Sequence, residues 1–192
     1  MSRALYIAIV LIGGLLIGGL SAQFAIERTY GIGAIKAGPW TAWPFVGGLE
    51  IDPYTSARNT IEGLVPLGAG EGLTFESAND SSGQRLLREC IYDLSGNTPA
   101  AQVWTLSAYT LDGRLIRNPE SGPSAILSSN VVRNIDYSMN IRLGDFPSSG
   151  NWMRLSGKGE FKLVFRLYDT PTTSSAGLSD PSMPKINRVE CP

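Results

Sequence analysis

Carboxylates are the side chains of this sequence that could most readily do chemistry. Asp112, Asp145 or Asp169 could act with Glu160 as the acid–base pair of a hydrolase. Each of these acids lies at an expected turn or strand end, where solvated and turn-forming acids are common. The chain contains no histidine, which excludes Ser-His-Asp and Cys-His catalysis and imidazole-based zinc sites. We therefore assign no catalytic residue and keep a carboxylate hydrolase as the less favoured alternative.

The chain has two cysteines, Cys90 and Cys191. Two thiols exclude a thiolate-rich metal site, and no Asp-x-Asp-x-Asp-Gly loop is present, so we expect no metal and no cofactor. An even pair beyond an apolar amino-terminal segment favours a disulfide in an oxidising compartment. Two unrelated buried thiols are the alternative.

The net charge is −1 and both signs are scattered along the chain. Nucleic-acid binding requires a concentrated basic face, so we expect no nucleic-acid partner.

The segment from Ala4 to Ile26 carries no charge. At ~1.5 Å per residue it spans roughly 35 Å, which is enough to cross a ~30 Å hydrocarbon core. We favour an uncleaved single-pass anchor over residues 1–27; a cleaved signal peptide is the rival interpretation, although its apolar stretch is normally shorter. Gly14 and Gly18 fit the G-x-x-x-G spacing of a helix–helix contact face, but glycine is also common in membrane helices generally.

A juxtamembrane linker is expected over residues 28–51. Pro39 and Pro44 oppose a regular helix there. Trp40 and Trp43 could lie at the level of the lipid head groups, or they could cover the base of the domain that follows.

A β-rich domain is expected over residues 52–192. Asp52 and Pro53 predict a helix cap and a short helix from Pro53 to about Glu62. Gln102–Pro119 predicts a hairpin with a type I′ turn at Asp112 and Gly113. Further strands are expected at 73–77, 86–94, 125–129, 137–143, 151–155, 160–168 and 186–190. The fold class is therefore all-β: a jelly-roll-like β-sandwich with one short amino-terminal helix, preceded by a single transmembrane helix.

Several motifs resemble those of the bacterial "domain of unknown function 1214" family, in its short membrane-anchored, alphaproteobacterial form. The resemblance covers roughly Asp52 to Cys191 and implies an all-β, jelly-roll-like fold but no agreed activity. The motifs that carry it are Pro66–Phe75, Cys90–Tyr92 with Leu94–Gly96, Trp104–Tyr109 with Asp112–Pro119, Gly150–Trp152 and Phe165–Tyr168.

Two functions outrank the hydrolase. The first is a membrane-anchored periplasmic interaction or accessory module with a protein partner in the envelope. It places the chain in the bacterial inner membrane with its carboxyl-terminal domain in the periplasm. The second is a glycan-binding module in which Trp104, Tyr109, Asn118 and Trp152 supply stacking and hydrogen bonds. The alternative for Trp104 and Trp152 is packing in the core or at an edge.

Overall fold

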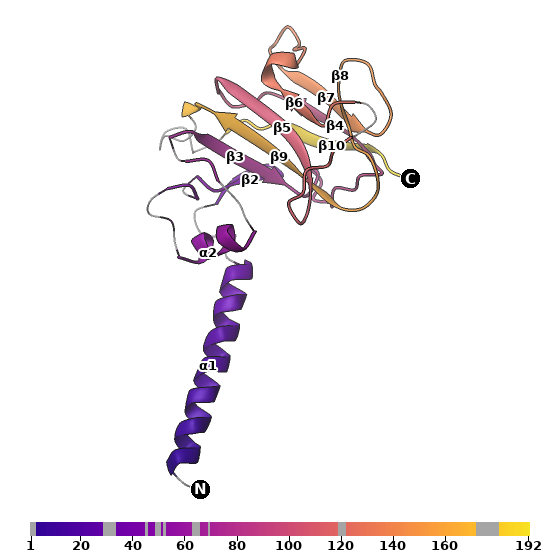
Figure 1. Ribbon diagram of the computed structural model, residues 1–192. Helices are drawn as coiled ribbons and strands as arrows, with labels where there is room; N and C mark the ends of the chain where they lie inside the picture. Colours follow the sequence, from indigo (N-terminus) through magenta and orange to yellow (C-terminus); the bar gives the residue numbers. More distant parts are fainter. Residues whose placement is uncertain are drawn as a thin grey trace. The chain divides into compact units, whose positions relative to one another are not determined.

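The computed structural model describes residues 3–28, 34–44, 46–48, 51, 53–62, 66–68, 70–118, 122–171 and 181–192 (Figure 1). The chain divides into two compact units. The first comprises Met1–Ile32 and Leu49–Val65, and the second comprises Gly33–Gly48 and Pro66–Pro192. Each unit is described by itself below.

The first unit contains the two α-helices, α1 (Arg3–Arg28) and α2 (Pro53–Glu62). Within α1, Arg3–Phe24 is long and apolar enough to cross a membrane, and its residues are not buried. The predicted amino-terminal helix is confirmed, and its length and composition suit either an anchor or a signal sequence. The helix predicted from Pro53 to Glu62 is also confirmed, whereas the predicted cap at Asp52 lies outside the described residues.

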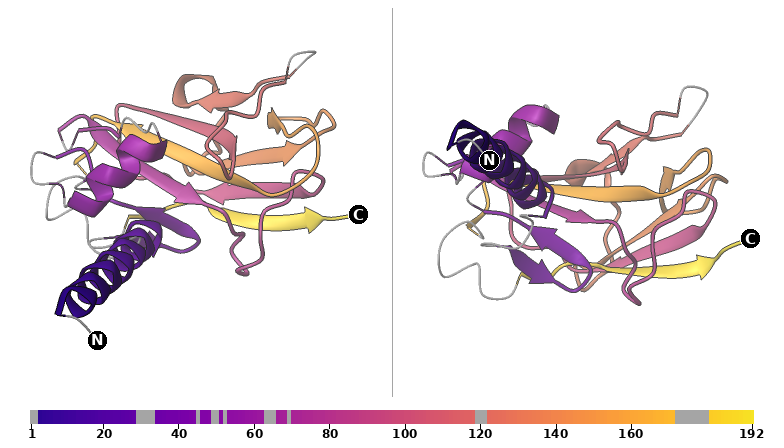
Figure 2. Two further views of the ribbon diagram at one scale, coloured as in Figure 1. Left: turned by 60° about the horizontal axis from the view of Figure 1, so that its bottom comes forward. Right: turned by 90° about the horizontal axis from the view of Figure 1, so that it is seen from below.

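The second unit is a β-sandwich, as predicted. One sheet has the order β1-β2-β3-β9-β5-β6 and the other has the order β10-β4-β7-β8. Figure 2 shows β10, in yellow, running to the carboxyl terminus. The strands are β1 (Ile35–Ala37), β2 (Trp40–Ala42), β3 (Gly72–Ser77), β4 (Ile91–Gly96), β5 (Val103–Thr110), β6 (Ala125–Leu127), β7 (Met139–Gly144), β8 (Asn151–Arg154), β9 (Phe161–Tyr168) and β10 (Lys185–Glu190), with a 3-10 turn at Ser128–Asn130.

Strand β9 lies between β3 and β5 in the larger sheet and supplies much of the core. Its alternate residues Phe161, Leu163, Phe165 and Leu167 are fully buried, as the period-two pattern predicts. Trp104 of β5 stacks on Phe165 with ring centroids 4.8 Å apart. The smaller sheet closes the sandwich with a second row of buried side chains: Tyr92, Leu94, Met139, Ile141, Leu143, Met153 and Ile186.

The segment predicted as a linker, 28–51, contains β1 and β2, and the structure groups Gly33–Gly48 with the sandwich. β2 pairs with β3 through Thr41 and Ala42. Trp40 is fully buried; its indole Nε1 donates to the Pro184 carbonyl at 2.7 Å. Of the two positions considered for Trp40, packing in the domain is the one observed. Trp43 is partly buried.

The hairpin after β5 differs from the predicted type I′ turn. Gly113 N donates to Thr110 O and Thr110 N donates to Arg114 O, so the loop has three residues, Leu111–Gly113. Gly113 has φ 84, while Asp112 has no positive φ. A type I turn followed by one left-handed glycine spares Asp112 the steric cost that its Cβ would meet at positive φ.

Strands β4 and β7 begin two or more residues later than predicted. The strand predicted over 86–94 begins only at Ile91, so Cys90 precedes β4 rather than lying within it. The strand predicted over 137–143 begins at Met139, because Tyr137 takes a left-handed conformation (φ 63) in a turn closed by Tyr137 N to Asn134 O.

Candidate functional site

Two of the acids considered for a hydrolase, Asp112 and Asp145, are held in ion pairs with arginines. Asp112 forms an ion pair with Arg114, and Asp145 forms one with Arg154 at 2.9 Å. Hydrogen bonds from the Thr110 and Arg114 side chains lower the pKa of Asp112, the opposite of what a general acid needs. No group of three or more acids or cysteines that could hold a metal occurs among the described residues.

Two of the aromatic residues considered for ligand binding, Trp104 and Tyr109, lie on opposite faces of β5. Trp104 is 2% exposed and belongs to the core between the sheets. Tyr109 lies on the outer face of the larger sheet, where its hydroxyl accepts from Arg166 Nη1 at 3.2 Å and the guanidinium lies 5.3 Å from its ring centroid. Trp104 and Tyr109 therefore cannot stack on the same ligand.

Asn118 and Trp152 lie close together, but their hydrogen-bonding groups are used within the fold. Asn118 Nδ2 donates to Arg154 O at 3.0 Å, and its Oδ1 accepts from Ser156 Oγ at 2.7 Å. Trp152 Nε1 donates to Gly144 O at 3.0 Å. These contacts fasten β8 and its neighbouring loops, so the predicted four-residue ligand site is not assembled.

A polar hollow of about 290 Å³ lies beside the smaller sheet. We call it the amide hollow. It is lined by three amides, two hydroxyls, one ion pair and two further residues: Asn134, Asn140 and Asn151; Ser148 and Ser149; Asp93 and Arg142; Val132 and Gly150.

The topology explains why these residues meet. In β7 the buried side chains Met139, Ile141 and Leu143 alternate with Asn140 and Arg142, which therefore lie on the outer face of the sheet. β8 runs parallel to β7. The connection 145–150 must consequently return along the sheet, and it brings the two serines to the hollow.

Asn151 fixes the wall of the amide hollow. Its Oδ1 accepts from Val132 N at 2.8 Å, and its Nδ2 donates to Val132 O at 2.7 Å and to Asn140 O at 3.0 Å. This side chain therefore clamps the loop before β7 onto the sheet. It positions the wall and retains little hydrogen-bonding capacity for a ligand.

The ion pair provides a rigid, neutral floor. Arg142 Nε lies 2.5 Å from Asp93 Oδ1, and Arg142 Nη2 donates to Asp93 Oδ2 at 3.2 Å. Two parallel contacts fix the planar groups against each other. In register across the sheet, Asn187 lies beside Asp93, and Trp152 lies beside Arg142.

Asn140 is the group of the hollow most available to a ligand. Its side chain is exposed, and among the described residues its amide has no hydrogen-bond partner. The serine hydroxyls are exposed as well. The predicted strand 137–143 contains Asn140 and Arg142, but the sequence did not bring them together with Ser148, because the parallel pairing of β8 leaves no signal in the periodicity.

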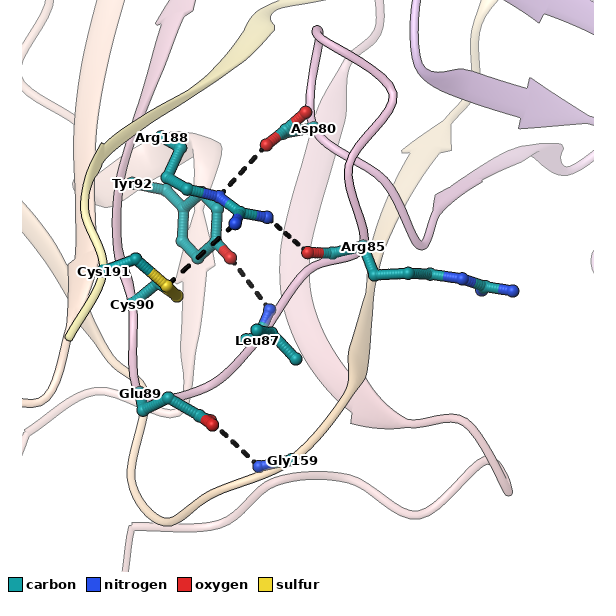
Figure 3. The surroundings of a disulfide bond; sticks show 9 residues. All are labelled: Asp80, Arg85, Leu87, Glu89, Cys90, Tyr92, Gly159, Arg188 and Cys191. Atoms are coloured by element: carbon teal, nitrogen blue, oxygen red, sulfur yellow. Dashed lines mark hydrogen bonds and ion pairs between the residues drawn. A yellow bond between two sulfur atoms is a disulfide. The ribbon is translucent and has the colours of Figure 1, made fainter.

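A separate polar cluster surrounds the disulfide between Cys90 and Cys191 (Figure 3). The Asp80 side chain is 1% exposed and pairs with Arg188, whose guanidinium lies 5.6 Å from the Tyr92 ring centroid. Burial raises the pKa of Asp80, but hydrogen bonds from Ser82 and Gln84 and the charge of Arg188 outweigh it, so the net pKa is lowered. Burial also raises the pKa of Tyr92. The cluster fastens β10, and the predicted disulfide is present.

The glycine pair of α1 remains a prediction. A Cβ built on Gly14 or on Gly18 would have no neighbour within 4 Å. The surface is therefore open to a second helix, and the structure contains no such helix to test the contact.

Comparisons with known proteins give a family and a fold. A profile of the family described as "Protein of unknown function (DUF1214)" matches residues 71–172. The VPA0106 protein from Vibrio parahaemolyticus is similar in structure: its TM-score is 0.58 at 21% identity, over 71% of this chain and 35% of that one. An uncharacterised protein from Burkholderia cenocepacia has a TM-score of 0.46 at 14% identity, over 94% of this chain and 52% of that one. No curated protein matches the sequence. The chain thus spans about a third to a half of the length of these two structures.

Proposed function

Because this chain belongs to the family described as "Protein of unknown function (DUF1214)", whose name carries no activity, we propose its function from its residues: it is a membrane-tethered, extracytoplasmic module that binds carbohydrate at the amide hollow. The proposal places the chain in the bacterial inner membrane as a single-pass protein, with the sandwich in the periplasm. The apolar helix Arg3–Phe24 and the disulfide support this placement.

The observation that carries the carbohydrate assignment is the balance of hydrogen-bonding groups in the hollow. Amides and hydroxyls both donate and accept, and so do the hydroxyl groups of a sugar. The charges of Asp93 and Arg142 cancel in their ion pair. An anion would require donors in excess and a cation would require acceptors in excess, so a neutral polyhydroxylated ligand fits best.

The amount of available polar surface also favours a sugar. The hollow lies at the lower end of the volume range of small-molecule sites, about 300–1,000 Å³, but its lining is polar where drug-like pockets are mostly apolar. Trp152 is partly exposed next to Arg142 at the rim of the same face.

A glycan-array screen tests this function. The full-length chain is reconstituted in lipid nanodiscs, because many detergents carry sugar head groups that would compete. We expect binding to a restricted set of glycans and reduced binding by Asn140→Ala. Asn187→Ala is the matched control: it removes an exposed amide from the same sheet, outside the hollow. Absence of binding by the folded wild-type chain would contradict the proposal.

A second function, as an accessory module for a protein partner in the envelope, is favoured by a separate observation. The turn from Arg133 to Met139 is closed by Asn134 N to Ser138 O and by Arg133 Nη1 to Tyr137 O. It presents Ile135, fully exposed, and Tyr137, 78% exposed. Exposed apolar side chains that gather in one patch mark interaction surfaces, and these two side chains lie two residues apart on one turn.

Affinity purification separates this second function from the first. The full-length chain is extracted under mild conditions as wild type, as Ile135→Asp and with Gly14 and Gly18 replaced by Ile. A stoichiometric partner lost with Ile135→Asp identifies the turn as the docking surface, and one lost with the glycine variant identifies the helix. A chain that purifies alone in all three forms contradicts the accessory function.

A further inference from the structure

A larger cleft lies on the other side of the loop that walls the amide hollow. It has a volume of about 440 Å³, and its lining includes Ala101, Val103, Trp104, Ser129 and Arg133. We call it the Trp104 cleft. Its walls combine small apolar side chains with hydroxyls and with a single charged group, the guanidinium of Arg133.

The Trp104 cleft and the amide hollow are adjacent. Arg133 lines the cleft, and its two sequence neighbours, Val132 and Asn134, line the hollow. One extended segment of chain therefore separates the two cavities. A ligand with several linked units can occupy both by crossing that segment, whereas a single small molecule cannot.

The charge of Arg133 is not compensated in the cleft. Its guanidinium lies 5.9 Å from the centroid of the Trp104 ring. Among the described residues it forms no ion pair, and no carboxylate lines the cleft. The nearest acid in sequence, Asp136, accepts hydrogen bonds from Ser138 N and Oγ instead.

The Trp104 cleft offers more hydrogen-bond donors than acceptors, whereas the amide hollow offers both. One guanidinium nitrogen of Arg133 donates to Tyr137 O, and the remaining N–H groups of the planar fork face no protein acceptor among the described residues. The buried indole N–H of Trp104 also has no hydrogen-bond partner among them. A carboxylate matches such a fork of donors in geometry and in charge.

We propose that the Trp104 cleft is a second subsite that binds the carboxylate of an acidic sugar unit, so that the ligand of this chain is an acidic oligosaccharide spanning the cleft and the hollow. The inference rests on the proposed carbohydrate binding at the hollow and names the class of its ligand. The hollow takes a neutral unit and the cleft takes the acidic unit, with the loop 131–134 between them.

Matched acidic and neutral oligosaccharides test the inference by titration calorimetry on the full-length chain in nanodiscs. One pair is a tetrasaccharide of alternating N-acetylglucosamine and N-acetylmuramic acid against chitotetraose, which has the same backbone without carboxylates. The other is an oligogalacturonate against its methyl ester. We expect the acidic member of at least one pair to bind about tenfold more tightly than its neutral partner, a preference that falls as salt is raised.

Two variants, each lacking one positive charge, show whether Arg133 causes the preference for the acidic ligand. Arg133→Gln should abolish the acid preference while leaving the affinity for the neutral member unchanged. Arg114→Gln, on the exposed hairpin turn, should change neither. Equal binding of both members of each pair, or an acid preference that survives Arg133→Gln, overturns the inference and leaves the proposed function standing. Absence of binding to all four compounds by the folded chain overturns both.

Discussion

Breaking the disulfide is the perturbation whose effect the structure defines most fully. Cys90 and Cys191 are 101 residues apart in sequence, with Cα atoms 4.2 Å apart. In the chain-entropy account, a bond that closes a loop of this size removes about 4.7 kcal/mol of conformational freedom from the unfolded chain. The reduced native state keeps its other contacts, because β10 remains paired with β4 from Lys185 to Glu190. We therefore expect reduction to lower the free energy of unfolding by about 4–5 kcal/mol without unfolding the sandwich.

Urea unfolding followed by tryptophan fluorescence measures this difference. The four tryptophans lie at positions 40, 43, 104 and 152, all within the second unit, so the signal reports on the sandwich and not on α1. Oxidised chain, reduced chain and the double variant Cys90→Ala, Cys191→Ala are compared. For a domain of this size, the loss should lower the melting temperature by roughly 10–20 °C.

Two controls make the result interpretable. The double variant, treated with or without reductant, should unfold identically, which shows that the reductant acts only through the disulfide. The slope of the free energy against urea should stay similar in all forms, because the surface exposed on unfolding changes little. If reduction changes the unfolding midpoint by less than the error of the measurement, the reasoning that the bond stabilises the fold by closing a loop in the unfolded chain is refuted.

Three further variants probe the packing that positions β10 and β8. Asp80→Ala should destabilise the fold by about 3 kcal/mol, because it leaves Arg188 unpaired. The folded-state pKa of Asp80 is lowered. The stability that its carboxylate contributes should therefore be present above its unfolded-state pKa of about 3.9 and lost as the pH falls through the lower folded value. Urea midpoints of wild type and variant measured across that range should converge at low pH. Gly122→Ala places a Cβ 2.8 Å from the Trp152 ring at φ +93 and should cost about 1–3 kcal/mol in the same assay; an unchanged midpoint would contradict the contact. Trp40→Phe removes the 2.7 Å hydrogen bond to a buried carbonyl and should cost about 1–3 kcal/mol, whereas a loss below 0.5 kcal/mol, less than a single net hydrogen bond contributes, would contradict that role.

The alternation of apolar and polar residues predicted the strands that have one buried face and one exposed face. β9 alternates between fully buried apolar residues and the partly exposed Lys162 and Arg166, and this contrast fixed both its position and its inner face. The sequence favoured a disulfide between Cys90 and Cys191 over two unrelated buried thiols, and the disulfide is present.

Elements fixed by tertiary contacts were missed. β1 and β2 have three residues each, too few to show a period. β2 is held by its pairing with β3 and by the burial of Trp40, and β1 is held by its pairing with β2. The hairpin turn was assigned from the Asp-Gly pair alone, and the added loop residue Leu111 changed its type.

The candidate site was only partly visible in the sequence. Trp104 and Trp152 were candidates for stacking on a glycan, with packing in the core or at an edge as the alternative; Trp104 lies in the core, and the Trp152 indole donates to a backbone carbonyl. Asn140 lay in the predicted strand 137–143, but most of its neighbours in the hollow come from other segments, including the return loop 145–150 and β4. Such long-range proximity depends on sheet order, which local patterns do not encode.

The most direct test of the central claim is the affinity of the amide hollow for the best ligand from the array, measured by titration calorimetry on the full-length chain in nanodiscs. Losing one hydrogen bond from Asn140 is worth about 1 kcal/mol, so Asn140→Ala should weaken binding about fivefold. Asn187→Ala should stay within a factor of about two of wild type. An unchanged affinity for Asn140→Ala, or equal losses for both variants, would show that the sugar does not bind in the hollow.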